Sequence, residues 1–287
     1  MNIKKYDFAV IGGDMRQVYL CEGLASLGYS VCEYALCVEN TPSSIYHAPS
    51  MEEAVRSAPA ILAPIPMERN QIFNHQTKQT DLTLETLTTA LQRGQYLFAG
   101  CIPQSCDATL TEKGVHICDF MKEEAVAIYN TIATAEGAIS EAISKSPLNL
   151  HRSPCLILGY GRCGKTLASY LKGMFCQVTV CARNPIARAE AEILVDEAID
   201  ICQLDPNLNR FPFIFNTVPE LLITRPLLEK LQPDTVIIDI ASAPGGVDYN
   251  AAKELDRSAY LCPGLPGKYA PKSSADSMIQ IVTHKLY

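Results

Sequence analysis

A glycine-rich turn between a strand and a helix constrains this chain more than any other feature of its sequence. The apolar run Cys155–Leu158 leads into Gly159–Gly164, which has the spacing G-x-G-x-x-G and precedes a helical pattern. In that context Gly159 allows a tight turn, Gly161 lets the backbone approach a pyrophosphate, and Gly164 lets helix and strand pack closely. The sequence therefore predicts a dinucleotide-binding α/β domain. The predicted cofactor contacts in this turn are Gly159, Tyr160, Gly161, Arg162, Cys163 and Gly164.

The end of the next predicted strand indicates which dinucleotide is bound. This strand, Gln177–Cys181, leads into Ala182, Arg183 and Asn184, which we include among the cofactor contacts. A site that prefers NAD usually has Asp or Glu here, about 20 residues after the first glycine, to bind the ribose 2′-hydroxyl. The next acidic residue of this chain is Glu190. A guanidinium in place of the carboxylate favours NADP(H); the alternative is that Arg183 is a solvent-facing loop residue.

Two further strands should end at the same edge of the sheet. They are predicted at Phe213–Phe215 and Val236–Ile240, and the segment after the second lies where contacts to a nicotinamide usually fall. We expect cofactor contacts from Thr217, Val218, Pro219 and Ala241, and a substrate contact from Ser242.

Short apolar runs alternate with helical patterns through both halves of the chain, as in doubly wound parallel sheets. The polar, proline-bounded segment Lys145–Pro154 marks the expected domain junction. We therefore predict two Rossmann-like domains that face a cleft. Residues 1–145 form the substrate and catalytic domain, residues 146–287 bind NADP, and the last helix, Lys272–Leu286, packs back on the first domain. The other strands are predicted at Asp7–Ile11, Ser30–Cys37, Ala60–Ile65, Tyr96–Ala99, Val115–Cys118 and Tyr260–Leu261.

Three local predictions concern the first half of the chain. The polar segment Pro66–Thr80 is expected to be a surface loop. Asp81 is expected to cap a helix that ends at Gly94, because carboxylates accept hydrogen bonds from the first N–H groups of a helix. The spacing of apolar residues predicts a long amphipathic helix over Asn130–Ser144.

Composition excludes several classes of protein. Among 287 residues, 24 Lys and Arg face 31 Asp and Glu, so the formal charge is −7. Such a chain is a poor binder of nucleic acid or of anionic membranes, whose attraction depends on basic residues. The first residues lack a signal-peptide pattern, and no apolar stretch reaches the length of a membrane-spanning helix. The 12 cysteines form no C-x-x-C motif, so we expect reduced thiols, no metal and a cytoplasmic protein.

Two polar motifs are candidates for the substrate side of the cleft. Asp14, in the turn Gly12–Arg16, is expected either to contact substrate or to cap the following helix. Arg16 is expected to hold a carboxylate, the alternative being an exposed helix residue. The Gly- and Pro-rich loop that ends at Lys272 suggests a rigid wall, and Lys272 is placed to bind an anion.

The histidines argue against ordinary 2-hydroxy-acid chemistry. Such a dehydrogenase needs a histidine, held by a carboxylate, that takes the hydroxyl proton. After the nicotinamide-side segments the sequence offers only His284, in the last turn of the final helix.

Several blocks together resemble the family of dipicolinate synthase A subunits. The blocks are VIGGDMRQ (10–17), AIYNTIATAEGAI (127–139), LGYGRCGKTLA (158–168), IDIASAPGGVDY (238–249) and PGLPGKYAPKSSA (263–275). The resemblance implies oxidation of dihydrodipicolinate to dipicolinate with NADP⁺ in the mother cell of a spore-forming bacterium. It also implies a partner, the flavoprotein-like B subunit of dipicolinate synthase. Homo-oligomerisation is left open.

That chemistry requires cations for two carboxylates and one base. Arg16 and Lys272 are the expected carboxylate ligands, and Asn130 is expected to line the substrate site. Glu136 is the expected base, its alternative being a solvent-facing helix residue. Two other functions stay open at this point, which are another NADP-linked amino- or imino-acid dehydrogenase and a non-catalytic NADP-binding subunit.

Overall fold

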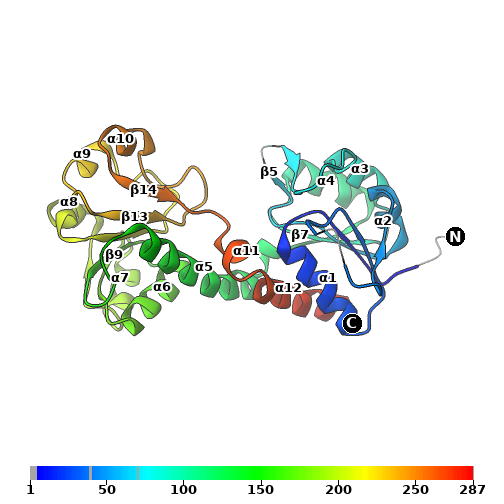
Figure 1. Ribbon diagram of the computed structural model, residues 1–287, viewed down its shortest axis with the longest axis horizontal. Coiled ribbons are helices and arrows are strands. Elements are labelled where there is room, and N and C mark those ends of the chain that lie inside the picture. The colour runs from blue at the N-terminus through cyan, green and yellow to red at the C-terminus, as the bar shows by residue number, and fades with distance from the viewer. Residues whose placement is uncertain (1–4, 39–40, 70, 287) are drawn as a thin grey trace. The chain divides into compact units, whose positions relative to one another are not determined.

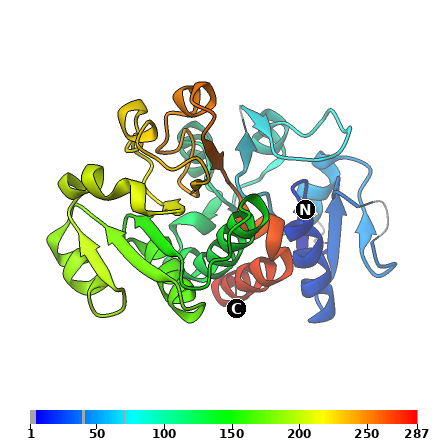
Figure 2. The same ribbon diagram turned by 60° about the vertical axis from the view of Figure 1, so that its left-hand side comes forward.

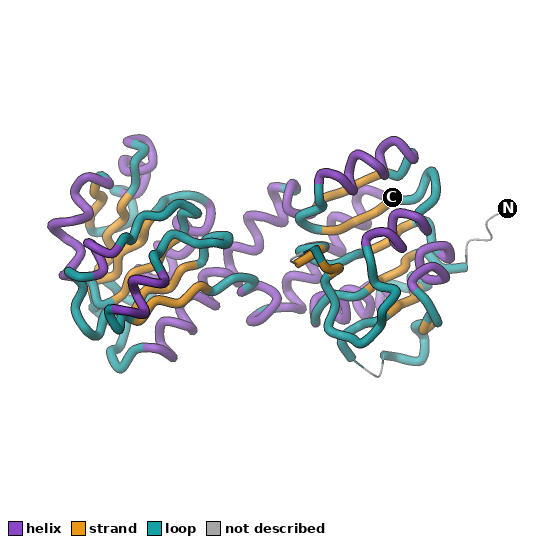
Figure 3. The backbone as a smooth tube through the Cα atoms, turned by 90° about the horizontal axis from the view of Figure 1, so that it is seen from above, coloured by secondary structure: helices purple, strands orange, loops and turns teal. Residues whose placement is uncertain are grey.

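The computed structural model describes residues 5–38, 41–69 and 71–286 and divides the chain into two compact units. The first unit comprises residues 1–129 and 270–287, and the second comprises residues 130–269. Each unit contains one six-stranded sheet whose paired strands are all parallel. Helices cover both faces of each sheet (Figures 1 and 3). The predicted α/β class with two Rossmann-like sheets is confirmed.

The first sheet reverses its strand order next to its first strand. The order is β3-β2-β1-β4-β7-β8, so the chain winds outward in both directions from β1. Ligands of open parallel sheets usually bind at such a switch point, beyond the carboxyl ends of the strands. The strands are β1 (Phe8–Ile11), β2 (Val31–Tyr34), β3 (Tyr46–His47), β4 (Ala60–Leu62), β7 (Tyr96–Ala99) and β8 (His116–Asp119).

The C-terminal helix of the first unit packs beside its first helix, as predicted (Figures 1 and 2). Gly23 permits this contact, because a Cβ there would lie 2.4 Å from Cδ1 of Ile279. The helices of this unit are α1 (Met15–Ser26), α2 (Met51–Ser57), α3 (Leu84–Ala90), α4 (Gln104–Lys113), the 3₁₀ turn η1 (Phe120–Lys122) and α12 (Pro271–Leu286).

Two local predictions for this unit are wrong. Within the predicted loop Pro66–Thr80, β5 (Glu68–Arg69) and β6 (Ile72–Phe73) form an antiparallel pair. Strands of two residues are too short to give a periodic signal. Thr83, rather than Asp81, caps α3, which ends at Ala90. The carboxylate of Asp81 instead accepts hydrogen bonds from two groups that are distant in sequence, the hydroxyl of Tyr34 and the backbone N–H of Met51.

The second sheet has the same topology. Its order is β11-β10-β9-β12-β13-β14, with the switch point between β9 and β12. The glycine-rich turn follows β9 directly, so the sheet presents that turn where dinucleotides usually bind. The strands are β9 (Pro154–Leu158), β10 (Gln177–Cys181), β11 (Glu197–Ile199), β12 (Phe213–Asn216), β13 (Val236–Asp239) and β14 (Ser258–Leu261).

The long helix α5 (Glu124–Lys145) decides where the units divide. Its residues Ala135, Ala138 and Ala142 are buried in one core with Cys155 and Ile157 of β9. Most of α5 therefore belongs to the second unit, and the division lies at 129/130 rather than within 145–154. The assignment of substrate and cofactor roles to the two parts stays a prediction.

Shorter helices complete the second unit. The longest of these, α6, follows the glycine-rich turn. They are α6 (Arg162–Gly173), α7 (Pro185–Ala191), η2 (Ile201–Gln203), α8 (Leu204–Asn207), η3 (Leu208–Arg210), α9 (Arg225–Leu228), α10 (Tyr249–Glu254) and α11 (Leu265–Tyr269). Within the described residues, no helix is both long and apolar enough to cross a membrane.

Candidate functional site

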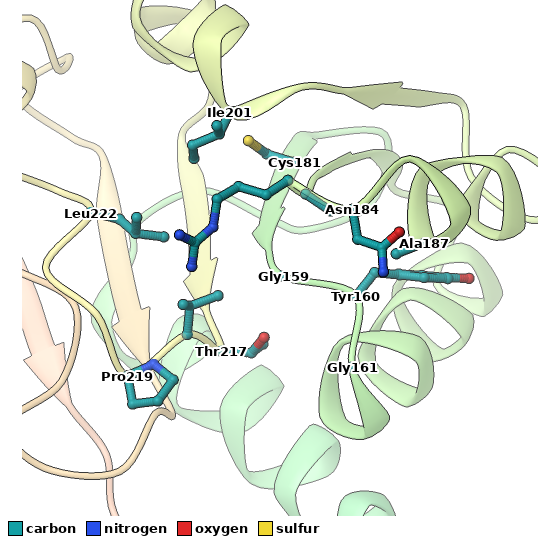
Figure 4. Close-up of a pocket in the computed structure, with 13 residues that line it drawn as sticks. Gly159, Tyr160, Gly161, Cys181, Asn184, Ala187, Ile201, Thr217, Pro219 and Leu222 are labelled. Carbon is teal, nitrogen blue, oxygen red and sulfur yellow. The ribbon is translucent and has the colours of Figure 1, made fainter.

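A pocket of ≈ 390 Å³ lies at the turns that follow β9, β10 and β12. Figure 4 shows Tyr160, Asn184 and Ala187 on one side, with Thr217, Pro219 and Leu222 on the other. The structure thus gathers three separate segments into one cavity. The predicted cofactor contacts that line it are Gly159, Tyr160, Gly161, Ala182, Arg183, Asn184, Thr217, Val218 and Pro219. Its other lining residues, for which the sequence offers no motif, are Cys181, Ala187, Ile201 and Leu222.

Three glycines shape the turn at this pocket, and two of them, Gly159 and Gly161, line it. Gly159 has φ +91°, and a Cβ there would lie 2.5 Å from Oγ1 of Thr217. A Cβ on Gly164 would lie 2.4 Å from the carbonyl oxygen of Gly159. Gly161 differs, because a Cβ there would meet nothing within 4 Å. Two glycines are therefore required for packing, whereas the third leaves open space at the backbone.

The helix α6 begins at that open space. Gly161 is its N-cap residue, and no side chain in the described part of the chain caps it. The first N–H groups of a helix attract anions when no capping side chain takes them. The turn therefore fits the pyrophosphate of a dinucleotide.

Arg183 lies in the pocket wall and forms an ion pair. Its Nη2 donates to Oε2 of Glu220 at 2.6 Å, with 62% of the Arg183 side chain and 56% of the Glu220 side chain exposed. The backbone of this loop is held separately, since Arg188 Nη1 donates to the carbonyl oxygens of Ala182 (2.7 Å) and Arg183 (2.8 Å). Sequence reasoning misses Glu220 and Arg188 because neither lies in a recognisable motif.

A buried carboxylate organises the loops after β12 and β13. Asp239 is fully buried and accepts hydrogen bonds from Asn216 Nδ2, the backbone N–H groups of Ala241 and Gly246, and the hydroxyl of Tyr249. Burial, and then the hydrogen bond to Asp239, raises the pKa of Tyr249. Ala241 is thereby fixed beside β13. The predicted substrate contact Ser242 is exposed in the same loop.

At the carboxyl end of β1 in the first unit, Arg16 is buried and held by Asp14. Nε and Nη2 of Arg16 donate to the two carboxylate oxygens of Asp14 at 2.9 and 2.7 Å, and Nη2 also donates to the carbonyl oxygen of Ile65. Asp14 also caps α1 through the backbone N–H of Arg16. Burial raises the pKa of Asp14, but the hydrogen bonds and charge of Arg16 outweigh it and hold the pKa below its usual range.

The remaining predicted site residues lie in different places. Lys272 is exposed in the first turn of α12, in the same unit as Arg16. Glu136 is exposed on α5 and accepts a hydrogen bond from the hydroxyl of Tyr170 at 3.4 Å. Glu136 and Tyr170 line a separate groove between α5 and α6. Asn130, near the start of α5, has a buried side-chain oxygen that lacks a hydrogen-bond partner among the described residues.

A histidine lies beside the first glycine turn, where no sequence pattern indicates one. A Cβ on Gly12 would lie 3.6 Å from Cβ of His75, and the N–H of Gly13 donates to the carbonyl oxygen of Asn74. The segment after β6 therefore packs on the Gly12–Gly13 turn and brings an imidazole to the carboxyl end of β1. A polar segment that resembles an open loop carries no signal for such a contact.

The described residues contain no cluster of three His, Cys, Asp or Glu side chains arranged to hold a metal ion. All 12 cysteines are free thiols, and most of them are buried. Burial raises the pKa of Cys181, for example, to about 12. Thiols of this kind are poor nucleophiles, because the thiolate is the reactive form.

The fold and the pocket define a dinucleotide-binding protein of the dehydrogenase type. Residues 126–254 match the family model described as the NAD binding domain of D-isomer specific 2-hydroxyacid dehydrogenases. Residues 7–121 match the model of the N-terminal domain of the dipicolinate synthase A subunit. The first part of the chain is thus similar to dipicolinate synthase A subunits, and the second part is similar to this NAD binding domain.

One curated relative and two crystal structures are also similar to this chain. The dipicolinate synthase A subunit of Bacillus subtilis (strain 168) is 34% identical over 163 residues, which are 56% of this chain and 54% of that protein. The aligned part thus spans about half the length of this curated relative. The crystal structure of the A subunit from Bacillus halodurans superposes with a TM-score of 0.86 at 25% identity, covering 98% of this chain and 97% of that one. The crystal structure of the A chain from Bacillus subtilis gives 0.85 at 24% identity, covering 99% and 96%.

Proposed function

We propose that this chain oxidises dihydrodipicolinate to dipicolinate with NADP⁺ as the hydride acceptor. The single observation that carries the proposal is the pocket at the glycine-rich turn, in a chain that is similar to dipicolinate synthase A subunits. The reaction is taken from the name of these similar proteins, and the pocket is the proposed site for the oxidant, NADP⁺.

The reaction balances as the loss of one hydride and one proton from a dihydropyridine dicarboxylate. NADP⁺ supplies the oxidising power by accepting the hydride, and the proton leaves to a base or to water. The product ring is aromatic, which favours the reaction, so the base need not have a strongly shifted pKa. What the protein must provide is orientation of a dianion and exclusion of competing reactions.

Arg16 and Lys272 are the residues that we propose for the two carboxylates. Asp14 supports this role of Arg16, because its bidentate contact fixes the guanidinium in one orientation. An arginine that is held in this way loses little further freedom when a carboxylate binds to the remaining edge of its guanidinium. Lys272 is supported by its position in the first turn of a helix, where the helix dipole disfavours a cation and favours an anion beside it.

Two variants can identify the base that takes the proton from the substrate. Glu136 is the base expected from the sequence, but its carboxylate contacts Tyr170 in a groove separate from the pocket. His75 beside the Gly12 turn is a second candidate. A general base contributes about 10²–10⁴-fold to the rate. Glu136→Gln and His75→Gln variants, assayed for kcat, identify the base by a loss of that size.

We further propose NADP over NAD, and association with the B subunit of dipicolinate synthase in the mother cell during spore formation. Arg183 in the pocket wall supports the first of these, because the loop after β10 reaches the adenosine ribose in this fold. Similarity to proteins that are named as one subunit of a synthase supports the second.

Incubation of the purified chain with dihydrodipicolinate and NADP⁺ tests the proposal, with NADPH followed by its absorbance. Formation of NADPH and dipicolinate in equal amounts is the expected result. If the chain oxidises amino or imino acids but not dihydrodipicolinate, the proposed substrate is wrong. Activity only after addition of the B subunit would make this chain the cofactor-binding component of a joint enzyme.

A further inference from the structure

We propose that Glu220 limits how strongly this chain prefers NADP over NAD, because it competes with the 2′-phosphate for Arg183. The inference rests on the proposed function in one respect, which is that NADP binds in the pocket at Gly159–Gly164. It adds a specificity-determining residue that neither the glycine-rich turn nor the loop after β10 contains.

The ion pair joins two separate walls of the pocket. Arg183 belongs to the wall after β10, whereas Glu220 directly follows Pro219 in the wall after β12. Their side chains meet at 2.6 Å, although the residues are 37 positions apart in sequence. The guanidinium that would recognise a phosphate is thus already directed toward a carboxylate.

Charge decides what this contact does to each cofactor. A 2′-phosphate carries up to two negative charges, so it must displace Glu220 from Arg183 or bind while it is repelled by Glu220. The ribose 2′-hydroxyl of NAD is neutral and does neither. The pair therefore weakens NADP binding and leaves NAD binding nearly unchanged.

The contacts that hold the backbone around Arg183 do not involve Glu220, so the competition affects only the Arg183 side chain. Arg188 holds the carbonyl oxygens of Ala182 and Arg183 and pairs with Asp200 at 2.5 Å. The loop therefore keeps its conformation when Glu220 is changed, and only the Arg183 side chain gains freedom. Because both side chains of the pair are more than half exposed, the competition is modest. We expect an effect of about three- to tenfold in affinity, which corresponds to the upper range of an exposed pair plus like-charge repulsion.

Calorimetric titration of NADP and NAD against wild type, Glu220→Gln, Arg183→Ala and the double variant tests the inference. Glu220→Gln should bind NADP about three- to tenfold more tightly and NAD within about twofold of wild type. In the Arg183→Ala background, Glu220→Gln should tighten NADP binding by no more than about twofold, because the contested group is gone and only the repulsion between the carboxylate and the phosphate is left to relieve. Glu229→Gln is the matched control, because Glu229 is an exposed glutamate of the same unit at the end of α9.

The other outcomes overturn either the role of Glu220 or the proposed NADP site. Wild type that binds NADP, with a Glu220→Gln variant that binds it no more tightly, overturns the role of Glu220 and leaves the proposed function intact. Equal tightening of NADP and NAD, or the same gain in Glu229→Gln, shows a general charge effect and also overturns it. Wild type that binds neither cofactor, or NAD alone, overturns the proposed NADP site itself.

Discussion

The side-chain amide of Asn216 donates a hydrogen bond to Oδ1 of Asp239 at 2.8 Å, inside the second sheet and out of contact with solvent. Asn216 ends β12 and Asp239 ends β13, so the contact joins the starting points of two loops. The same amide also donates to the carbonyl oxygen of Val218, which lines the pocket. One pair of buried polar residues thereby fixes the pocket wall that contains Thr217–Pro219.

Asp239→Asn should lower the free energy of unfolding by about 2–4 kcal/mol. The carboxylate of Asp239 accepts four hydrogen bonds in a fully buried position. The amide of Asn has the same shape, but its NH₂ group can only donate, so it would face donors and lose two of these hydrogen bonds. Urea unfolding measures this loss. Asp234→Asn, an exposed aspartate in the turn before β13, is the control and should be neutral within about 0.5 kcal/mol.

Arg183→Ala should weaken NADP binding about tenfold and leave NAD binding nearly unchanged. Charge-assisted hydrogen bonds contribute about 1.5–3 kcal/mol, and the proposed competition from Glu220 offsets part of this. Ala182→Asp should weaken NADP further, because it adds like-charge repulsion and an acceptor for the 2′-hydroxyl. Calorimetric titration of both cofactors is the measurement. Equal losses for the two cofactors would show that Arg183 is not the phosphate ligand.

Lys272→Ala should weaken dipicolinate binding about ten- to a hundredfold without changing NADP affinity. The variant removes one charge-assisted contact to a carboxylate, and its exposed position at the start of α12 means that the fold tolerates the change. Titration of dipicolinate measures the effect. Lys253→Ala, an exposed lysine of α10, controls for the loss of positive charge. Unchanged dipicolinate affinity would remove Lys272 from the site.

Arg16→Ala should weaken dipicolinate binding about ten- to a hundredfold and also destabilise the first unit. Its removal leaves the carboxylate of Asp14 without its ionic partner and frees the carbonyl oxygen of Ile65. Arg16→Lys keeps the charge but loses the bidentate geometry, so it should recover stability better than binding. Urea unfolding and dipicolinate titration of both variants separate the two effects. A folded Arg16→Ala variant with wild-type affinity would contradict the assignment.

Glu141→Gln should destabilise the protein at neutral pH by about 1–2 kcal/mol. Hydrogen bonds from Lys268 and then Tyr269 hold the pKa of Glu141 at about 2, below its usual 4.5, and the exposure of Lys268 reduces the energy that this implies. Because the folded pKa is depressed, the stabilisation is complete above about pH 4.5 and is lost as the pH falls toward 2. Urea unfolding at about pH 7, 5 and 4 should show the variant's deficit shrinking only at the lowest pH. Glu192→Gln, at the exposed end of α7, should show no deficit.

Much of the second sheet and its turn could be predicted from local sequence. The strand Gln177–Cys181 and the glycines at 159, 161 and 164 lie as expected, because a buried parallel strand and a tight βα turn each leave a pattern within about ten residues. The cap of α1 by Asp14, one of the two alternatives considered for that residue, is equally local.

Contacts between distant residues could not be predicted in the same way. Arg183 meets Glu220 37 positions later, and Arg16 meets the carbonyl oxygen of Ile65 49 positions later. Asp81 could cap a helix, but its carboxylate accepts hydrogen bonds from the hydroxyl of Tyr34 and the backbone N–H of Met51 instead. Each of these side chains is able to bind a group nearby in sequence, as Arg16 does with Asp14, but the packing of strands and helices adds or substitutes a distant partner.

The sequence by itself determined that the chain forms two parallel α/β sheets and that one of them has a dinucleotide turn. The tertiary structure decided where the units divide, which groups Arg16 and Arg183 contact, and that Asp239 holds the pocket loops together. The reason is physical. Periodicity and glycine geometry act through neighbouring residues, whereas a buried charge or polar group takes whichever partner the folded chain brings within hydrogen-bonding distance.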